Sequence, residues 1–118
     1  MHAWLKTAIP KLPSLDIERS VHFFETLGFE RVAVHPTLAM ITRDGADIHF
    51  WLTDNPAIPL ETGCRVNVTG IDALYAEYLI LNVVHPKDPL GDKPWGLREF
   101  SILDLDGNLL TFSAPIPS

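Results

Sequence analysis

The sequence contains only one cysteine, Cys64, among its 118 residues, so the chain cannot form an internal disulfide. It also lacks a Cys-x-x-Cys pair and any Cys/His cluster, which are the patterns typical of structural zinc sites. A lone cysteine is usually a residue of a core or an interface. We therefore predict that Cys64 is structural and does not act as a nucleophile.

Long apolar runs are also lacking. No segment approaches the ~20 apolar residues that span a bilayer, and the residues from Met1 to Lys6 have neither the basic start nor the apolar stretch of a signal peptide. We expect a cytoplasmic protein with no membrane partner. Basic residues are few, and the net charge of -6 argues against nucleic acid as a partner while weakly favouring cationic ligands.

Several enzyme motifs are missing. The sequence has no P-loop, no Rossmann glycine fingerprint and no Ser, His and Asp motif. Asp106-Gly107-Asn108 is better explained as a turn than as carboxylate chemistry, because Gly readily takes positive φ. What the chain does have is 47% apolar and 20% charged residues, a composition that predicts one globular domain over residues 1–118.

The spacing of apolar residues predicts the same order of elements twice. In the first half a helix precedes three strands, with predicted ranges Ile17 to Leu27, Phe29 to Val34, Leu38 to Thr42 and Asp47 to Leu52. In the second half a strand, a helix and two further strands are predicted, at Arg65 to Thr69, Ile71 to Leu81, Leu97 to Leu103 and Leu109 to Ser113. Val83, Val84 and a long loop lie between the second helix and the strand that follows it.

We interpret this order as a duplication of a βαβββ unit, over about 1–53 and 62–118, which gives an α+β fold. Asp16 is placed to cap the first helix, and Gly28 and Asn82 stand at equivalent positions after the two helices. Two unrelated α+β stretches that share an order remain the alternative.

Three segments resemble a known family. They are Phe23-Phe24-Glu25-Thr26-Leu27-Gly28-Phe29, the helix Gly70 to Tyr78, and Pro94-Trp95-Gly96 followed by Arg98-Glu99-Phe100. They are similar to segments of the bleomycin resistance proteins, within the vicinal oxygen chelate superfamily that also contains glyoxalase I and the extradiol dioxygenases. Leu97, between Gly96 and Arg98, departs from the family pattern and affects how Trp95 is oriented. The resemblance implies two modules forming a cupped mixed sheet, and a homodimer that exchanges N-terminal strands and builds its ligand clefts from both chains.

Enzymes of this superfamily hold a divalent metal with His and Glu from four strands. Carried over to this chain, those positions fall near Ile9, at Gly63 and Cys64, at His49 and at Thr111, and only His49 is a good ligand. We therefore expect no metal, no cofactor and no catalytic residue. His49 alternates with Ile48 and Phe50 and should face the cupped side of the sheet, as a hydrogen-bonding cleft residue or as a structural histidine.

The aromatic residues indicate where a ligand binds. Trp95 follows a loop rich in proline and charge, where it either packs back onto the core or lines a ligand site; the resemblance favours the ligand site. Trp51 shares a strand face with His49 and lines the same concavity or a dimer contact, and Trp4 is expected at a subunit boundary. Where drug-binding relatives have aromatic residues, this chain has Leu38, Arg65 and Asn67.

The sequence thus predicts a non-catalytic protein, related to antibiotic resistance, that sequesters a bleomycin-like or other aromatic or cationic small molecule. The predicted ligand-binding residues are Trp95, His49, Trp51, Leu38, Arg65, Asn67 and Thr111. The alternatives are a metal-dependent lyase, isomerase or dioxygenase of the same fold, and an accessory domain that binds a metabolite or partner. Pro10 and Pro13 flank the predicted first strand, which suits an edge or exchanged strand because proline cannot donate to a ladder.

Overall fold

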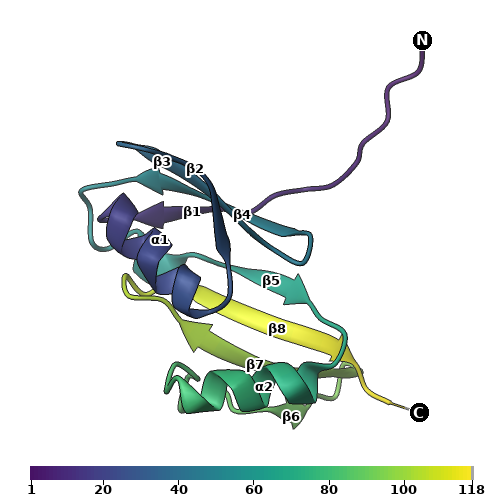
Figure 1. Cartoon of the computed structure of the whole chain (residues 1–118). Coiled ribbons are helices and arrows are strands. Elements are labelled where there is room, and N and C mark those ends of the chain that lie inside the picture. The colour runs from purple at the N-terminus through teal and green to yellow at the C-terminus, as the bar shows by residue number, and fades with distance from the viewer. Residues whose placement is uncertain (118) are drawn as a thin grey trace.

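Two four-stranded sheets, each with one helix, follow each other along the chain (Figure 1). The computed structural model describes residues 1–117. The first module has the elements β1 (Lys11–Ser14), α1 (Ile17–Thr26), β2 (Glu30–His35), β3 (Leu38–Arg43) and β4 (Ala46–Leu52). After the short helix η1 (Pro59–Glu61), the second has β5 (Gly63–Asn67), α2 (Ile71–Ile80), β6 (Gly91–Asp92), β7 (Leu97–Leu103) and β8 (Leu109–Pro115).

The two modules share one topology, which confirms the predicted α+β fold of two βαβββ units. The strand orders are β1-β4-β3-β2 and β5-β8-β7-β6, and in both sheets the first strand pairs in parallel with the last. The short strand β6 lies inside the predicted long loop and pairs with β7. Val84 forms only an isolated bridge to Ile102.

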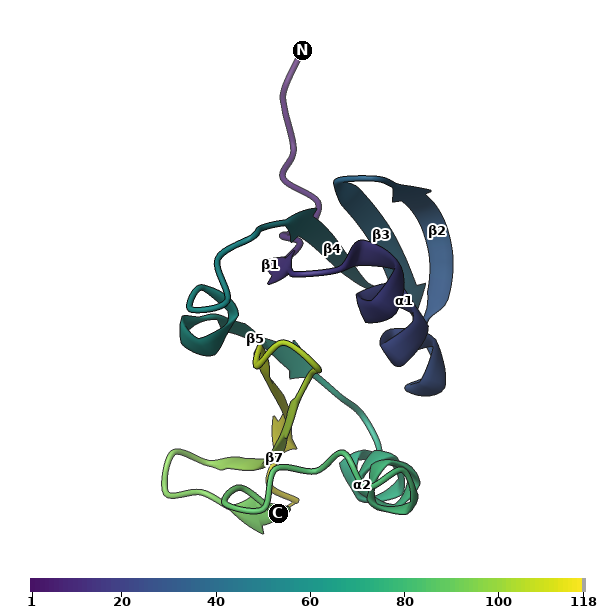
Figure 2. The ribbon, with the colours of Figure 1, turned by 90° about the vertical axis from the view of Figure 1, so that its left-hand side faces the viewer.

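The N-terminal segment differs from the prediction. Residues 1–10 have no secondary structure, and they extend away from both sheets (Figures 1 and 2). β1 begins at Lys11, directly after Pro10, but Pro13 lies within the strand instead of flanking it. β1 is nevertheless an edge strand that pairs only with β4, so the missing N–H of Pro13 leaves no gap in a central ladder.

Both helices begin and end where the local sequence predicts. Asp16 caps α1 by accepting a hydrogen bond from the Arg19 N–H at 3.0 Å. After the helices, Gly28 and Asn82 take φ of 92° and 57°, the left-handed conformation that ends a helix. Neither helix of the described residues is long and apolar enough to cross a membrane.

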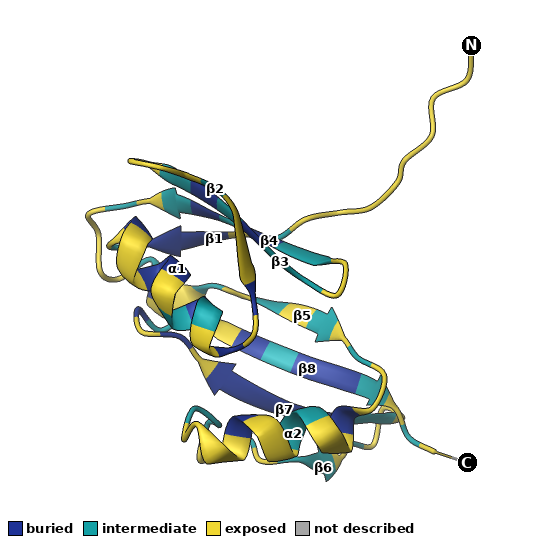
Figure 3. Ribbon diagram, in the orientation of Figure 1, coloured by how far each residue is buried: buried dark blue, intermediate teal, exposed yellow. Residues whose placement is uncertain are grey.

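Buried residues lie on the strands and helices of both modules (Figure 3), and many of these core residues are aromatic. Phe100 stacks on Phe112 with ring centroids 5.3 Å apart, and Tyr78 from α2 meets Phe112 edge-on. In the first module Phe24 packs on Phe50. Such pairs bury large apolar areas and hold each helix against one face of its sheet, which leaves the opposite faces uncovered.

Polar contacts fix one module against the other. The β7–β8 turn reaches the end of β1: Asp106 accepts a hydrogen bond from the Leu15 N–H at 3.0 Å and pairs with Arg19. In the same turn the Asn108 side-chain amide donates to the Pro13 carbonyl at 2.9 Å. The predicted turn at 106–108 therefore also connects the two modules through polar contacts.

Candidate functional site

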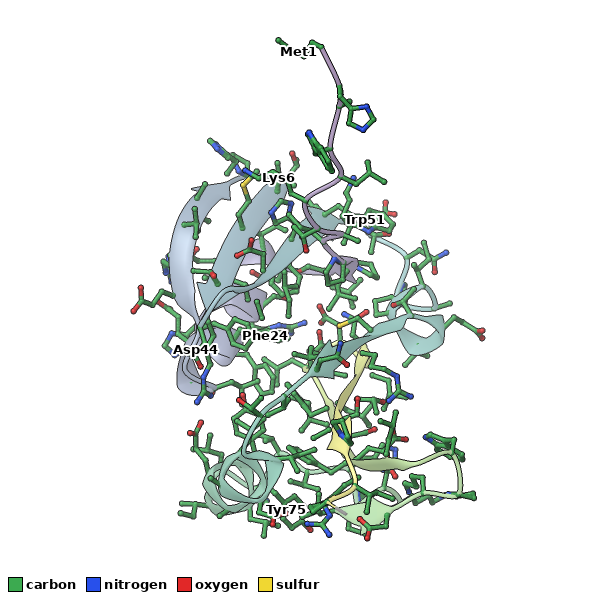
Figure 4. All side chains as sticks on the ribbon, turned by 90° about the vertical axis from the view of Figure 1, so that its right-hand side faces the viewer. Met1, Lys6, Phe24, Asp44, Trp51 and Tyr75 are labelled. Carbon is green, nitrogen blue, oxygen red and sulfur yellow. The ribbon has the colours of Figure 1, made fainter. Side chains whose placement is uncertain are left out.

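The sheet faces that the helices do not cover carry the residues that the sequence singled out. In the first module Leu12, Ile48 and Phe50 point into the core, so the residues that alternate with them point the other way. We call that side the module-1 face, formed by Lys11, Leu38, Met40, His49 and Trp51. Figure 4 shows Trp51 well apart from the core residue Phe24.

His49 lies in the middle of the module-1 face. It is opposite Lys11 of β1 on one side and Met40 of β3 on the other, and it is partly exposed. Within residues 1–117 no hydrogen bond engages its ring nitrogens, although its backbone N–H donates to the Pro10 carbonyl at 3.0 Å. The ring is therefore free to contact a ligand.

The corresponding side of the second sheet is the module-2 face, which is largely polar. Phe100 and Phe112 point into the core, so the outward residues are Arg65, Asn67, Glu99, Ser101, Thr111 and Ser113. Glu99 is buried and ion-pairs with Arg65, whose side chain is 46% exposed. The ion pair lies in the middle of this face, beside Thr111.

The register shows which residues lie beside the metal positions that the resemblance implies at His49 and Thr111. Lys11 of β1 is opposite His49, and Arg65 of β5 is opposite Thr111, so a cationic side chain lies next to each. Ile9, near which the first-strand ligand was expected, precedes β1 in the N-terminal segment. Among the described residues no group of three or more His, Cys, Asp or Glu side chains could hold a metal. The residues present do not fit a metal centre.

Cys64, the other mapped position, points away from this face. It packs against the hydrophobic core. Burial, together with the negative charge of nearby Asp104, raises the pKa of the Cys64 thiol to about 11. The thiol therefore stays protonated at neutral pH and is a poor nucleophile and a poor metal ligand.

A chain of hydrogen bonds joins the module-2 face to the loop that precedes β7. Thr111 and Ser101 share a hydrogen bond of 2.8 Å, Ser101 donates to the Asp88 carboxylate at 2.5 Å, and Lys93 contacts that carboxylate at 3.0 Å. Burial tends to raise the pKa of Asp88, but the hydrogen bonds from Ser101 and Lys93 outweigh it, and the pKa lies below its usual value.

Sequence patterns alone did not single out Asp88 or Glu99. Glu99 could have been found from strand alternation, because it is adjacent to the apolar Phe100 in the predicted strand Leu97 to Leu103 and so faces the opposite side.

Trp95 lies at the end of this loop and is 61% exposed. Gly96, with φ of 88°, closes a turn in which its N–H donates to the Lys93 carbonyl at 3.1 Å. The alternative that Trp95 packs onto the core is therefore wrong. Trp4 is also exposed, at 81%, in the N-terminal segment.

Six of the seven predicted residues form two groups on two sheets, and Trp95 lies apart from them in the loop before β7. Leu38, His49 and Trp51 lie on the module-1 face, and Arg65, Asn67 and Thr111 lie on the module-2 face. A separate cavity of about 890 Å³ is bordered by the Arg43–Ala46 turn, the end of β5 and the start of α2. Of the predicted residues only Asn67 lines it, and Ser113 of the module-2 face lines it too. The cavity therefore borders the end of the module-2 face and is separate from the module-1 face.

Comparison with known proteins adds independent information. The family described as "Glyoxalase/Bleomycin resistance protein/Dioxygenase superfamily" matches residues 10–112. Curated bleomycin resistance proteins from Geobacillus stearothermophilus and Staphylococcus aureus are 33% identical to the chain, over 94% of it and 98% of the relative.

Solved structures agree with these matches. The bleomycin-binding protein from the bleomycin producer Streptomyces verticillus, in complex with copper(II)-bleomycin, has a TM-score of 0.86 and 28% identity, covering 98% of this chain and 100% of that one. The bleomycin resistance determinant encoded on transposon Tn5 has a TM-score of 0.83 and 20% identity, covering 96% and 100%. At that identity the second likeness concerns the fold alone.

Proposed function

The chain belongs to the glyoxalase/bleomycin resistance protein/dioxygenase superfamily, and on that basis we propose that it binds and sequesters bleomycin or a related aromatic or cationic small molecule, without catalysis. Relatives over almost the whole length are named bleomycin resistance proteins, and a 28% identical structure is named for its bleomycin-binding activity. Sequestration requires affinity alone, so it needs no nucleophile, general base or metal.

The observation that carries this proposal is the composition of the two uncovered faces. Lys11 and Arg65 lie opposite His49 and Thr111, where the resemblance would require metal ligands, and Thr111 stands in place of a carboxylate. A divalent cation next to Lys11 would be repelled, and Glu99, the carboxylate on the module-2 face, is already ion-paired with Arg65. The module-1 face instead offers Trp51 to an organic ligand, and the loop before β7 offers the exposed Trp95.

We assign the ligand contacts to the seven predicted residues. Trp95 and Trp51 provide flat surfaces for an aromatic ligand, and cationic groups gain further attraction over an indole face. His49, Asn67, Thr111 and Arg65 provide hydrogen bonds, and Leu38 packs against the ligand. Leu38, Arg65 and Asn67 replace aromatic residues of drug-binding relatives, so the ligand stacks on fewer rings in this chain.

We propose that the complete cleft forms in a homodimer through exchange of the N-terminal strand. The module-1 and module-2 faces belong to different sheets of one chain, and β1 is an unprotected edge strand. The segment ahead of β1 carries exposed apolar residues that a free monomer would leave in water, namely Met1, Trp4 and Leu5. Docking this segment on a second copy would bury them and bring faces from two chains together.

Titration calorimetry of the purified protein with bleomycin tests the function. We expect saturable binding with one site for each chain of the homodimer. Metal analysis of protein prepared without a chelator is the companion measurement: one tightly held Ni, Zn, Mn or Fe per chain would contradict the proposal and favour the metal-dependent enzyme.

A further inference from the structure

Glu99 and Ser113 are directly opposite each other on β7 and β8, and both are buried on the module-2 face. Glu99 is 4% and Ser113 is 1% exposed. Their neighbours Phe100 and Phe112 point into the core, so these two polar side chains point to the opposite face, next to Arg65. The centre of this face therefore contains polar groups that water barely reaches.

Ser113 is the one side chain in residues 1–117 with a buried polar atom that has no hydrogen-bond partner. A buried hydroxyl without a partner lowers stability, and nearly all such groups in folded proteins are paired. Its backbone carbonyl, in contrast, accepts a hydrogen bond from Val68 at 2.8 Å. The unpaired hydroxyl is what is expected of a group whose partner is a ligand.

Glu99 also has bonding capacity left. Arg65 donates to Oε2 of Glu99, and no side chain of the described residues donates to Oε1. Ser113 Oγ is the buried side-chain atom without a partner in the described residues, and Glu99 Oε1 is not such an atom. Oε1 therefore keeps some accessible surface on the outer side of the sheet. The Arg65 side chain is 46% exposed and lies at the edge of the buried Glu99 and Ser113 side chains.

We propose that Glu99, Ser113 and Arg65 form a subsite that recognises a primary carboxamide on the ligand. The Arg65–Glu99 pair has no net charge, so a neutral group enters without adding an unpaired buried charge. Glu99 Oε1 accepts an amide N–H, while the Ser113 hydroxyl and the remaining Arg65 N–H groups donate to the amide oxygen. Directly opposite residues have Cβ atoms ~5 Å apart, a span that one planar amide bridges with a hydrogen bond on each side. This inference rests on the proposed function in placing the subsite within the ligand cleft.

An NMR titration of ¹⁵N-labelled full-length protein with benzamide, benzoate and benzylammonium tests the subsite. We expect benzamide to shift the backbone amides of Glu99 and Ser113 with a dissociation constant on the order of 10 mM, as suits so small a fragment. Benzoate and benzylammonium should bind there at least about tenfold more weakly, since each brings a net charge.

Two serine variants make the test specific. Ser113→Ala should weaken benzamide binding about tenfold without lowering Tm, because it removes a hydroxyl that has no partner in the chain. Ser101→Ala is the matched control, since Ser101 is also buried on this face but is bonded to Asp88 and Thr111. It should lower Tm and leave benzamide binding unchanged.

Three results would overturn the subsite: equal binding of a charged probe, a loss of Tm in Ser113→Ala comparable to that in Ser101→Ala, or benzamide shifts confined to the cavity residues Arg43–Ala46. Titration with bleomycin tests the proposed function independently of the subsite. If benzamide binds as expected and bleomycin does not bind, the subsite is supported and the proposed function is contradicted. If bleomycin binds and benzamide does not bind at Glu99 and Ser113, only the subsite is contradicted.

Discussion

At the residue scale, Trp95 gives the most direct test of ligand binding. Its indole is 61% exposed, so Trp95→Ala should leave the free energy of unfolding nearly unchanged. If the ligand stacks on it, the variant should bind bleomycin ~1–3 kcal/mol more weakly, measured by calorimetry. Leu105→Ala, which alters a residue of similar exposure on the β7–β8 turn, is the control and should not affect affinity. Unchanged affinity in Trp95→Ala would remove Trp95 from the site.

His49 tests whether the module-1 face takes part in binding. His49→Ala should preserve the fold, because within the described residues the ring makes no hydrogen bond. Affinity for bleomycin should fall by ~1–3 kcal/mol if the ring bonds to the ligand. Metal content, measured in parallel, should be the same in both proteins. Loss of a stoichiometric ion on substitution would instead favour the enzyme alternative.

At the scale of single elements, Asp88 anchors the loop that carries Trp95. Its pKa is lowered in the folded protein, so its contribution to stability is complete above the unfolded value of ~3.9 and is lost as pH falls through the folded value. Amide hydrogen exchange should therefore show the 85–96 loop opening more readily below about pH 4. In Asp88→Asn this acid dependence should be absent. An unchanged pH profile in the variant would show that Asp88 does not anchor the loop.

The turn between β7 and β8 is the second element with a testable role. Asn108 is fully buried; its amide donates to Pro13 and Asp104, and its oxygen accepts from Thr62. Asn108→Ala leaves these groups unpaired and should cost ~2–4 kcal/mol in the free energy of unfolding, measured by urea denaturation. Asn67→Ala, at an exposed position, should cost almost nothing. Equal stability of the two variants would contradict the idea that this turn joins the modules.

At the scale of the whole molecule, the N-terminal segment tests the dimer. Deleting residues 1–9 removes only exposed residues and should give a folded monomer, whereas deleting 1–12 also removes Leu12, which is 1% exposed, and should leave a poorly folded chain. Light scattering gives the mass and circular dichroism gives the fold. A well-folded dimer after the longer deletion would refute strand exchange.

The sequence predicted the fold well because its signals are local. The cap at Asp16, the left-handed residues after each helix and the alternation of β4 and β7 all lie within a few residues of the structure they determine. The end of β1 was misjudged, since Pro13 lies within the strand, because pairing with β4 across more than thirty residues defines that strand.

The site was harder to predict for the same reason. Alternation places His49 and Trp51 on one face, but it does not say that Lys11 is opposite His49 or that Glu99 pairs with Arg65. These neighbours depend on the register between strands that are distant in sequence. The unpaired Ser113 hydroxyl could not be predicted from the sequence, because it depends on whether the fold places any donor or acceptor within hydrogen-bonding distance of it.

The location of the three tryptophans has a practical consequence. Trp4 and Trp95 are largely exposed and Trp51 is on a sheet face, so none belongs to the core that melts on unfolding. Unfolding of a monomer should therefore change indole emission little, and the buried Tyr78 is the better optical probe of that transition. In the proposed homodimer the second copy buries Trp4, so a change in its emission should report dissociation of the dimer. Quenching of Trp95 or Trp51 by a ligand can then be measured on the folded dimer against the steady emission of Trp4.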